Sequence, residues 1–113
     1  MNIRSAFLVA ALVGAPIAAL AHAQLEQASP AAGATVQAMP TEVRLKFTKE
    51  ITEATTIAVT GPKGRADNGH PQYTAYALAV GLKPMGAGRY TVQWHAMSAD
   101  GHETEGRYAF TVK

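Results

Sequence analysis

Hydrophobic and polar residues alternate along several short stretches of this chain. In residues 41–48 the order Thr-Glu-Val-Arg-Leu-Lys-Phe-Thr places every second side chain on the same side of an extended backbone. A period of two residues is typical of a β-strand with one buried and one exposed face. The same alternation predicts further strands over residues 56–60, 90–96 and 107–112.

The stretch 90–96 carries its largest hydrophobic residues at alternate positions. Tyr90, Val92 and Trp94 share one face, which we expect to be buried, and His95 lies on the opposite, exposed face. Residues 74–80 are rich in alanine, which also favours helix, but the spacing of the other strands predicts a further strand there. Repeated short strands between turns predict an all-β domain, either an immunoglobulin-like antiparallel β-sandwich or a Greek-key β-barrel.

The first 21 residues have the layout of a secretory signal peptide. Arg4 gives a positive N-terminal region, an apolar segment follows over residues 6–20, and the chain then reaches an Ala-Leu-Ala sequence ending at Ala21. The alternative is an uncleaved membrane anchor, but the apolar segment is shorter than the ~20 residues of a spanning helix. We therefore expect cleavage after Ala21, export to the periplasm and one mature domain over residues 22–113.

Composition limits both the stabilising interactions and the partners of this domain. The chain has 113 residues, 48% of them hydrophobic and 16% charged, which suits one compact core and not a disordered chain. It contains no cysteine, so a hydrophobic core, with a metal ion as the only additional cross-link, must hold the exported protein together. The formal net charge is +2 and the positive residues are scattered along the sequence, which disfavours nucleic acid as a partner.

Removal of the leader would turn His22 into the first residue of the mature chain. An N-terminal histidine offers a free α-amine and a ring Nδ1, which together close a chelate ring around one metal ion. Because both nitrogens belong to one residue, the second bond costs little additional entropy. The alternative explanation is that a histidine follows the cleavage site by chance.

A second candidate feature is the sequence Asp100-Gly101-His102, between the last two predicted strands. Asp-Gly is a strong turn former because glycine accepts a positive φ, so a plain hairpin turn also explains this segment. Such a turn would nevertheless hold the carboxylate of Asp100 and the imidazole of His102 on one rim, where both could reach the same ion.

Together the two features form a donor set without sulfur. It comprises two nitrogens from His22, one nitrogen from His102 and one oxygen from Asp100. Such a set suits a tetragonal Cu(II) or Ni(II) centre, and Cu(II) stands higher in the Irving–Williams order. Zinc could use the same atoms but prefers a tetrahedral arrangement.

Several segments of the mature sequence match a known pattern: residues 22–25, 29–31, 43–47, 88–94, 98–102 and 110–112, with Gly33 and Gly106. In these segments the chain resembles the CopC family of periplasmic copper-binding proteins. The block Ser-Ala-Asp-Gly-His at 98–102 is the most specific match. The resemblance implies a Greek-key β-barrel or sandwich, and a Cu(II) site formed by His22 with its amine, Asp100 and His102.

The sequence departs from the CopC pattern in two places. Some members carry a second, Cu(I) site on a methionine-rich loop, but the corresponding residues 61–76 contain His70 and no methionine. The remaining methionines are dispersed, so we expect no Cu(I) site and a solvated His70. The position after Trp94, often arginine in the family, is His95 here, and either His95 or water is left as a possible additional ligand.

The leading hypothesis is a monomeric periplasmic carrier or buffer of one Cu(2+) ion that serves copper homeostasis or resistance. The resemblance suggests an inner-membrane copper transporter of the CopD type as a partner. An alternative is a small copper-dependent oxidase or monooxygenase, because an N-terminal histidine also binds copper in polysaccharide-oxidising enzymes. A short sandwich leaves little room for a substrate face, so we expect no enzyme activity. The other alternative is a structural β-sandwich without metal.

Overall fold

The structure, a computed structural model, describes residues 23–113. The regular elements in that range are all β-strands, and it contains no helix that could cross a membrane. The strands are β1 (Leu25–Ser29), β2 (Thr35–Val36), β3 (Glu42–Phe47), β4 (Thr56–Gly61), β5 (Gly64–Arg65), β6 (Gln72–Tyr73), β7 (Ala77–Gly81), β8 (Gly88–Met97) and β9 (Glu103–Val112).

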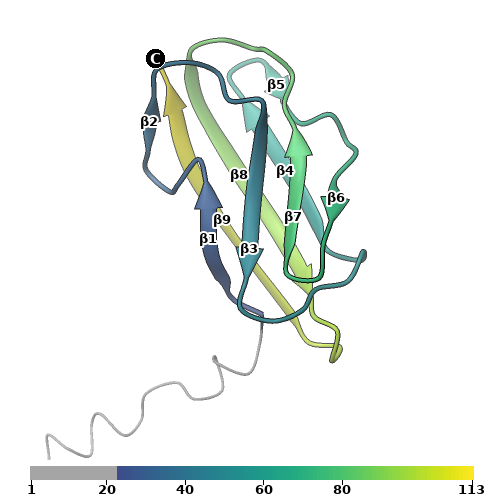
Figure 1. Cartoon of the computed structure of the whole chain (residues 1–113). Coiled ribbons are helices and arrows are strands. Elements are labelled where there is room, and N and C mark those ends of the chain that lie inside the picture. The colour runs from purple at the N-terminus through teal and green to yellow at the C-terminus, as the bar shows by residue number, and fades with distance from the viewer. Residues whose placement is uncertain (1–22) are drawn as a thin grey trace, which may run out of the picture.

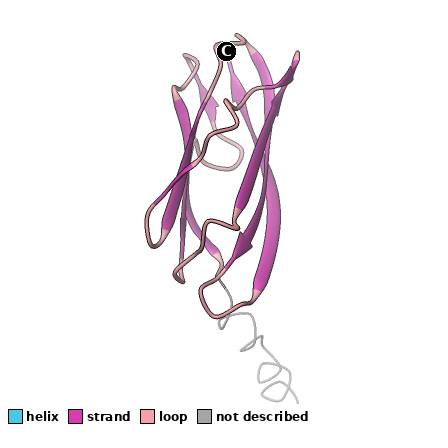
Figure 2. Ribbon diagram, turned by 90° about the vertical axis from the view of Figure 1, so that its right-hand side faces the viewer, coloured by secondary structure: helices cyan, strands magenta, loops and turns pink. Residues whose placement is uncertain are grey.

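The strands form two sheets that lie face to face, as the two views show (Figure 1 and Figure 2). The first sheet has the order β1-β3-β7-β6 and the second has the order β2-β9-β8-β4-β5. The predicted all-β sandwich is therefore confirmed. One pair departs from a purely antiparallel arrangement, since the two-residue strand β2 runs parallel to β9, with Thr35 opposite Thr111. β2 lies between β1 and β3 in the chain but joins the edge of the other sheet.

The four strands predicted from clear alternation correspond to β3, β4, β8 and β9. The strand expected over residues 74–80 is shorter, because β7 begins only at Ala77. Thr74 instead starts a tight turn from β6, in which its backbone N–H donates to the carbonyl of Ala77 over 2.8 Å.

The core fills the space between the two sheets. Tyr90 and Val92 are fully buried and Trp94 is nearly so, which confirms the predicted inward face of β8. Aromatic contacts join the sheets and their strands: the rings of Phe47 and Trp94 meet edge to face at 5.3 Å, and those of Tyr90 and Phe110 stack at 5.3 Å. Such contacts stabilise the sandwich beyond the burial of apolar area.

Several loops gather at one end of the sandwich, where β8 turns into β9 (Figure 1). Hydrogen bonds connect them: the N–H of Thr52 donates to the carbonyl of Met97 over 2.9 Å, and the N–H of Ile51 donates to the carbonyl of Ala75 over 2.8 Å. We call this end, formed by the loop 48–55, the turn 74–76 and the turn 98–102, the hairpin end.

Trp94 depends on a glycine in the neighbouring strand. It lies opposite Gly106 in the β8–β9 ladder, and a Cβ atom at position 106 would come within 2.6 Å of the indole ring. We expect Gly106→Ala to lower the free energy of unfolding by about 1–3 kcal/mol, because a core indole must move. Thermal unfolding and Trp94 fluorescence would measure this effect.

Gly81→Ala is the matched control. The added Cβ would come within 2.7 Å of Asn68, but the contact is with the end of an exposed polar side chain that can move aside. Equal destabilisation by the two substitutions would contradict the proposed role of Gly106.

Candidate metal centre

The turn between β8 and β9 closes on itself through two backbone hydrogen bonds. The N–H of Ser98 donates to the carbonyl of His102 over 2.9 Å, and the N–H of Gly101 donates to the carbonyl of Ser98 over 3.0 Å. Gly101 has φ of 91°, which glycine adopts without strain. The hairpin turn expected from Asp-Gly is therefore present, and it fixes the backbone that carries both candidate ligands.

The turn brings the side chains of Asp100 and His102 together. Oδ1 of Asp100 lies 3.1 Å from Nδ1 of His102, and it also accepts a hydrogen bond from the His102 backbone N–H over 3.3 Å. Both side chains are about half exposed, at 53% for Asp100 and 54% for His102. The two candidate ligands are thus held in one orientation while staying accessible to an ion from solvent.

The buried hydroxyl of Ser98 holds the carboxylate of Asp100 in place. Ser98 is buried, with 2% of its surface exposed, and its hydroxyl bonds to Oδ1 of Asp100. This bond, followed by those from His102, lowers the pKa of Asp100 to about 2. The carboxylate is therefore negatively charged over the whole physiological pH range.

The role of Ser98 was missed in the sequence analysis, where it was only part of a matching block. The available signal was its position two residues before Asp100, since a hydroxyl or carboxylate at that spacing commonly bonds within a turn.

His22 lies outside the described residues, so its position relative to Asp100 and His102 stays a prediction. The described chain begins at Ala23, which is 1% exposed and whose carbonyl accepts a hydrogen bond from the Thr104 hydroxyl over 2.6 Å. Gln24 and Thr48 are joined by two bonds, of 3.0 and 2.9 Å. The beginning of the described chain is therefore fixed at the hairpin end, beside a residue two positions from His102.

Within residues 23–113 no group of three or more His, Asp or Glu side chains is arranged to hold a metal ion. Asp100 and His102 supply one oxygen and one imidazole. The hydrogen bonds of Asp100 with Ser98 and His102 converge on its Oδ1.

The other described histidines have different surroundings. His95 projects from the outer face of β8, as predicted, and its Nε2 lies 2.9 Å from Oε1 of Glu103. His70 is exposed in the loop between β5 and β6, in agreement with a solvated side chain. Met39 and Met85 are partly buried and pack against the hydrophobic core.

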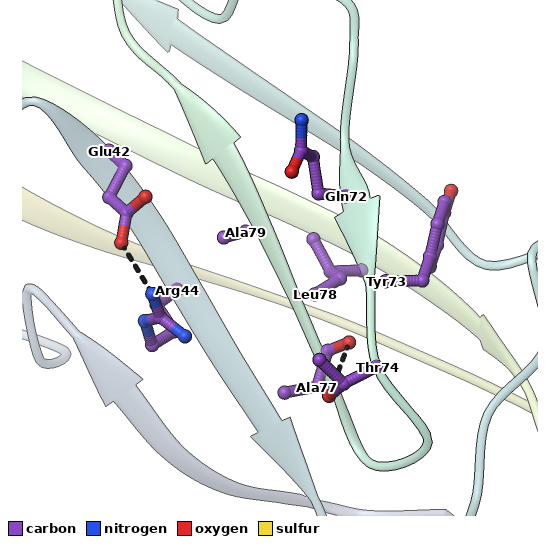
Figure 3. A pocket seen from close by; sticks show the side chains of 8 residues that line it. All are labelled: Glu42, Arg44, Gln72, Tyr73, Thr74, Ala77, Leu78 and Ala79. Atoms are coloured by element: carbon purple, nitrogen blue, oxygen red, sulfur yellow. Dashed lines mark hydrogen bonds and ion pairs between the residues drawn. The ribbon is translucent and has the colours of Figure 1, made fainter.

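A shallow groove crosses the outer face of the first sheet, and residues of the turn 98–102 do not line it. Figure 3 shows the small side chains of Ala77 and Ala79 between an ion pair on β3 and Gln72 on β6. The pair joins Glu42 and Arg44 over 2.9 Å. Because its one carboxylate is already paired with a guanidinium, this groove offers no set of metal ligands.

The fold and the turn define a class of protein: a small all-β domain with an accessible carboxylate–imidazole pair at the end of a long hairpin. Residues 25–113 match the CopC domain. The chain belongs to the CopC family, and the resemblance inferred from the sequence is confirmed.

Similar proteins cover most of the chain. Protein YobA of Escherichia coli K12 is 38% identical in an alignment of 102 positions that covers 82% of this chain and 80% of that protein. Copper resistance protein C of Escherichia coli is 33% identical over 98% of each chain. Among solved structures, CopC from Methylosinus trichosporium OB3b has a TM-score of 0.75 at 30% identity, covering 81% of this chain and 94% of that one. PcoC from Escherichia coli, a methionine-rich copper resistance protein, has a TM-score of 0.71 at 30% identity and covers 81% and 99%.

The Ser98 hydroxyl generates a testable titration. Ser98→Ala removes the largest cause of the low Asp100 pKa, so we expect that pKa to rise from about 2 toward its ordinary value of 3.8. Carboxyl ¹³C NMR of the metal-free protein would measure it. Thr60→Ala removes an exposed hydroxyl from β4 and should leave the Asp100 titration unchanged.

The lowered pKa of Asp100 also makes the stability of the folded protein depend on pH. Because the folded state lowers the pKa of Asp100, the ionised carboxylate stabilises the fold above pH 3.8. This stabilisation is lost as the pH falls toward 2. An unchanged Asp100 titration in Ser98→Ala would show that Ser98 does not hold the carboxylate.

Proposed function

We propose that this protein is a periplasmic Cu(II)-binding protein of copper homeostasis or resistance, and that it holds one Cu(2+) per mature chain. The proposed ligands are the α-amine and ring nitrogen of His22, a carboxylate oxygen of Asp100 and an imidazole nitrogen of His102. The observation that carries the proposal is the hydrogen bond from Thr104 to Ala23, because it anchors the residue after His22 at the hairpin that holds the other two ligands.

The geometry supports a site assembled from both ends of the mature chain. A single peptide bond links His22 to Ala23, whose carbonyl is fixed 2.6 Å from the Thr104 hydroxyl. Asp100 and His102 already lie in one orientation on the turn, so binding requires little rearrangement there. Cleavage after Ala21, which the proposal requires, would supply the free amine.

The donor chemistry favours Cu(II) over Cu(I). Imidazole, amine and carboxylate donors suit Cu(II), whereas Cu(I) prefers thiolates and thioethers. The solved relative PcoC is described as methionine rich, but this chain has four methionines in all, and two of them pack against the core. We therefore propose a Cu(II) site without an accompanying Cu(I) site.

The proposed role is that of a carrier or buffer and not of an enzyme. Two relatives of this chain bear the name copper resistance protein C. A monomer that holds one copper ion at an exposed hairpin could take it up from, or pass it to, another protein. An inner-membrane transporter of the CopD type is the partner that the family resemblance suggests.

The free amine provides the first test. Cu(II) bound to protein that starts at His22 should give an electron paramagnetic resonance spectrum of nitrogen-rich tetragonal coordination. A version with one extra residue before His22 should lose that spectrum, because the chelate of amine and ring no longer exists. Identical spectra from the two proteins would contradict the proposed ligand set.

Single histidine substitutions provide the second test. Only the folded chain brings the proposed ligands together, so Cu(II) at ~100-fold above its Kd should stabilise the protein by about 2.7 kcal/mol. Thermal unfolding measures this stabilisation as a rise in Tm when Cu(II) is added. His102→Ala should lose most of the rise, whereas His70→Ala, on an exposed loop, should retain it. The opposite pattern in the two variants would move the site to the loop between β5 and β6.

The stabilisation by Cu(II) should also shrink as the pH drops through about 6, since protons compete for the nitrogens.

A further inference from the structure

The hairpin end is acidic. Carboxylates are exposed on its loop 48–55 and on its turn 98–102, namely Glu50, Glu53 and Asp100, and Glu103 follows directly at the start of β9. Lys49 is the only lysine or arginine in the three segments that form this end. The fold therefore gathers negative charge around the candidate ligands, although the chain as a whole is mildly basic.

The opposite end of the sandwich is basic. Lys63, Lys83 and Arg89 are exposed there, and none of them forms an ion pair within the part of the chain that the structure describes. Their loops are close together: the N–H of Lys83 donates to the carbonyl of Ala66 over 2.8 Å, and Pro62 packs against Gly88.

The two ends act as separate electrostatic surfaces. The ten residues of β8 span the sandwich, a length of about 33 Å at the rise of a β-strand. Charges are screened over about 8 Å at physiological ionic strength, so a molecule near one end responds only to that end. The net charge of the chain consequently says little about either surface.

A groove of about 370 Å³ runs across the hairpin end and reaches Asp100. Its lining includes Glu50, Ala99 and Tyr76. Tyr76 is 48% exposed and is the only large hydrophobic residue exposed in the described part of the chain. Its backbone is fixed, since its carbonyl accepts a hydrogen bond from the N–H of Phe47 over 2.8 Å.

We propose that this groove is a docking surface for a basic polypeptide segment: a lysine- or arginine-rich loop or tail of another protein that carries one apolar or aromatic side chain. Its cations pair with the carboxylates of the hairpin end or stack on Tyr76, and its apolar side chain lies in the groove. The inference rests on the proposed function in one respect, namely that a segment reaching Asp100 belongs to a protein that exchanges the metal.

The chemistry of the surface selects this occupant. Complementary charge accelerates encounter and orients the partner, and an exposed tyrosine ring adds cation–π attraction. Anionic lipid and nucleic acid are repelled by the same carboxylates. Lys49 lies in the groove and opposes a basic segment, so it limits the affinity of a complex that must separate after exchange.

The test uses metal-free protein that starts at His22 and a synthetic peptide, acetyl-Lys-Lys-Trp-Lys-Lys-amide, followed by ¹H–¹⁵N NMR. We expect shifts confined to the amides of residues 48–50, 76 and 98–100. The shifts should disappear when NaCl is raised from about 20 mM to about 300 mM, because the attraction is screened. The matched peptide acetyl-Glu-Glu-Trp-Glu-Glu-amide should produce none of them.

Substitutions separate docking from misfolding. Tyr76→Ala and Glu50→Gln should each weaken peptide binding by about 3- to 10-fold, as loss of one aromatic or ionic contact would. Lys49→Gln should strengthen it by about 2-fold, a gain that a damaged fold cannot give. Glu42→Gln removes the same unit charge from an ion pair on β3 and should change nothing.

Three outcomes would overturn the proposal: shifts centred on the basic end, equal binding of the acidic peptide, or salt-sensitive self-association of the protein alone, which would make a second copy the occupant. The titration contains no copper. Docking in a protein that fails to bind Cu(II) would therefore reject the proposed function alone, and copper binding without docking would reject only this inference.

Discussion

The antiparallel ladder between β8 and β9 determines both the core and the candidate site. It pairs residues continuously from Gly88–Val112 to Met97–Glu103. One face of the ladder buries Tyr90 and Trp94, and its closed end forms the turn that holds Asp100 beside His102. A slip of one residue would turn the aromatic rings toward solvent, so the burial of the core also fixes the register of the two candidate ligands.

A buried hydroxyl gives the exposed carboxylate its defined position. Ser98 is inaccessible to solvent, yet it bonds to an Asp100 side chain that is half exposed. The polar group at the surface thus takes part of its geometry from the interior, in addition to its bonds with His102. Such an arrangement keeps a charged candidate ligand in a defined position while leaving it accessible from solvent.

The parts of the fold that follow simple periodicity were predictable, and the parts that depend on contacts were not. β3, β4, β8 and β9 alternate clearly and were predicted. β1 contains a bulge between Leu25 and Gln27 at the edge of its sheet, so its sequence lacks the alternation that signals a strand. The pairing of Asp100 with His102 followed from turn chemistry, but the direction of the Ser98 hydroxyl depends on burial. The segregation of charge depends on topology, since Lys63 is distant in the sequence from Lys83 and Arg89.

The attachment of Ala23 to Thr104 has a consequence for the lifetime of the protein. Ala23 leads into β1 of the first sheet, whereas Thr104 belongs to β9 of the second. A copper ion held as proposed would bond the two layers to each other at the point where the edge strand β1 is most prone to fraying. Loaded molecules would then resist local opening and proteolysis, and empty ones would be degraded first, so copper supply itself would regulate how much of the protein persists.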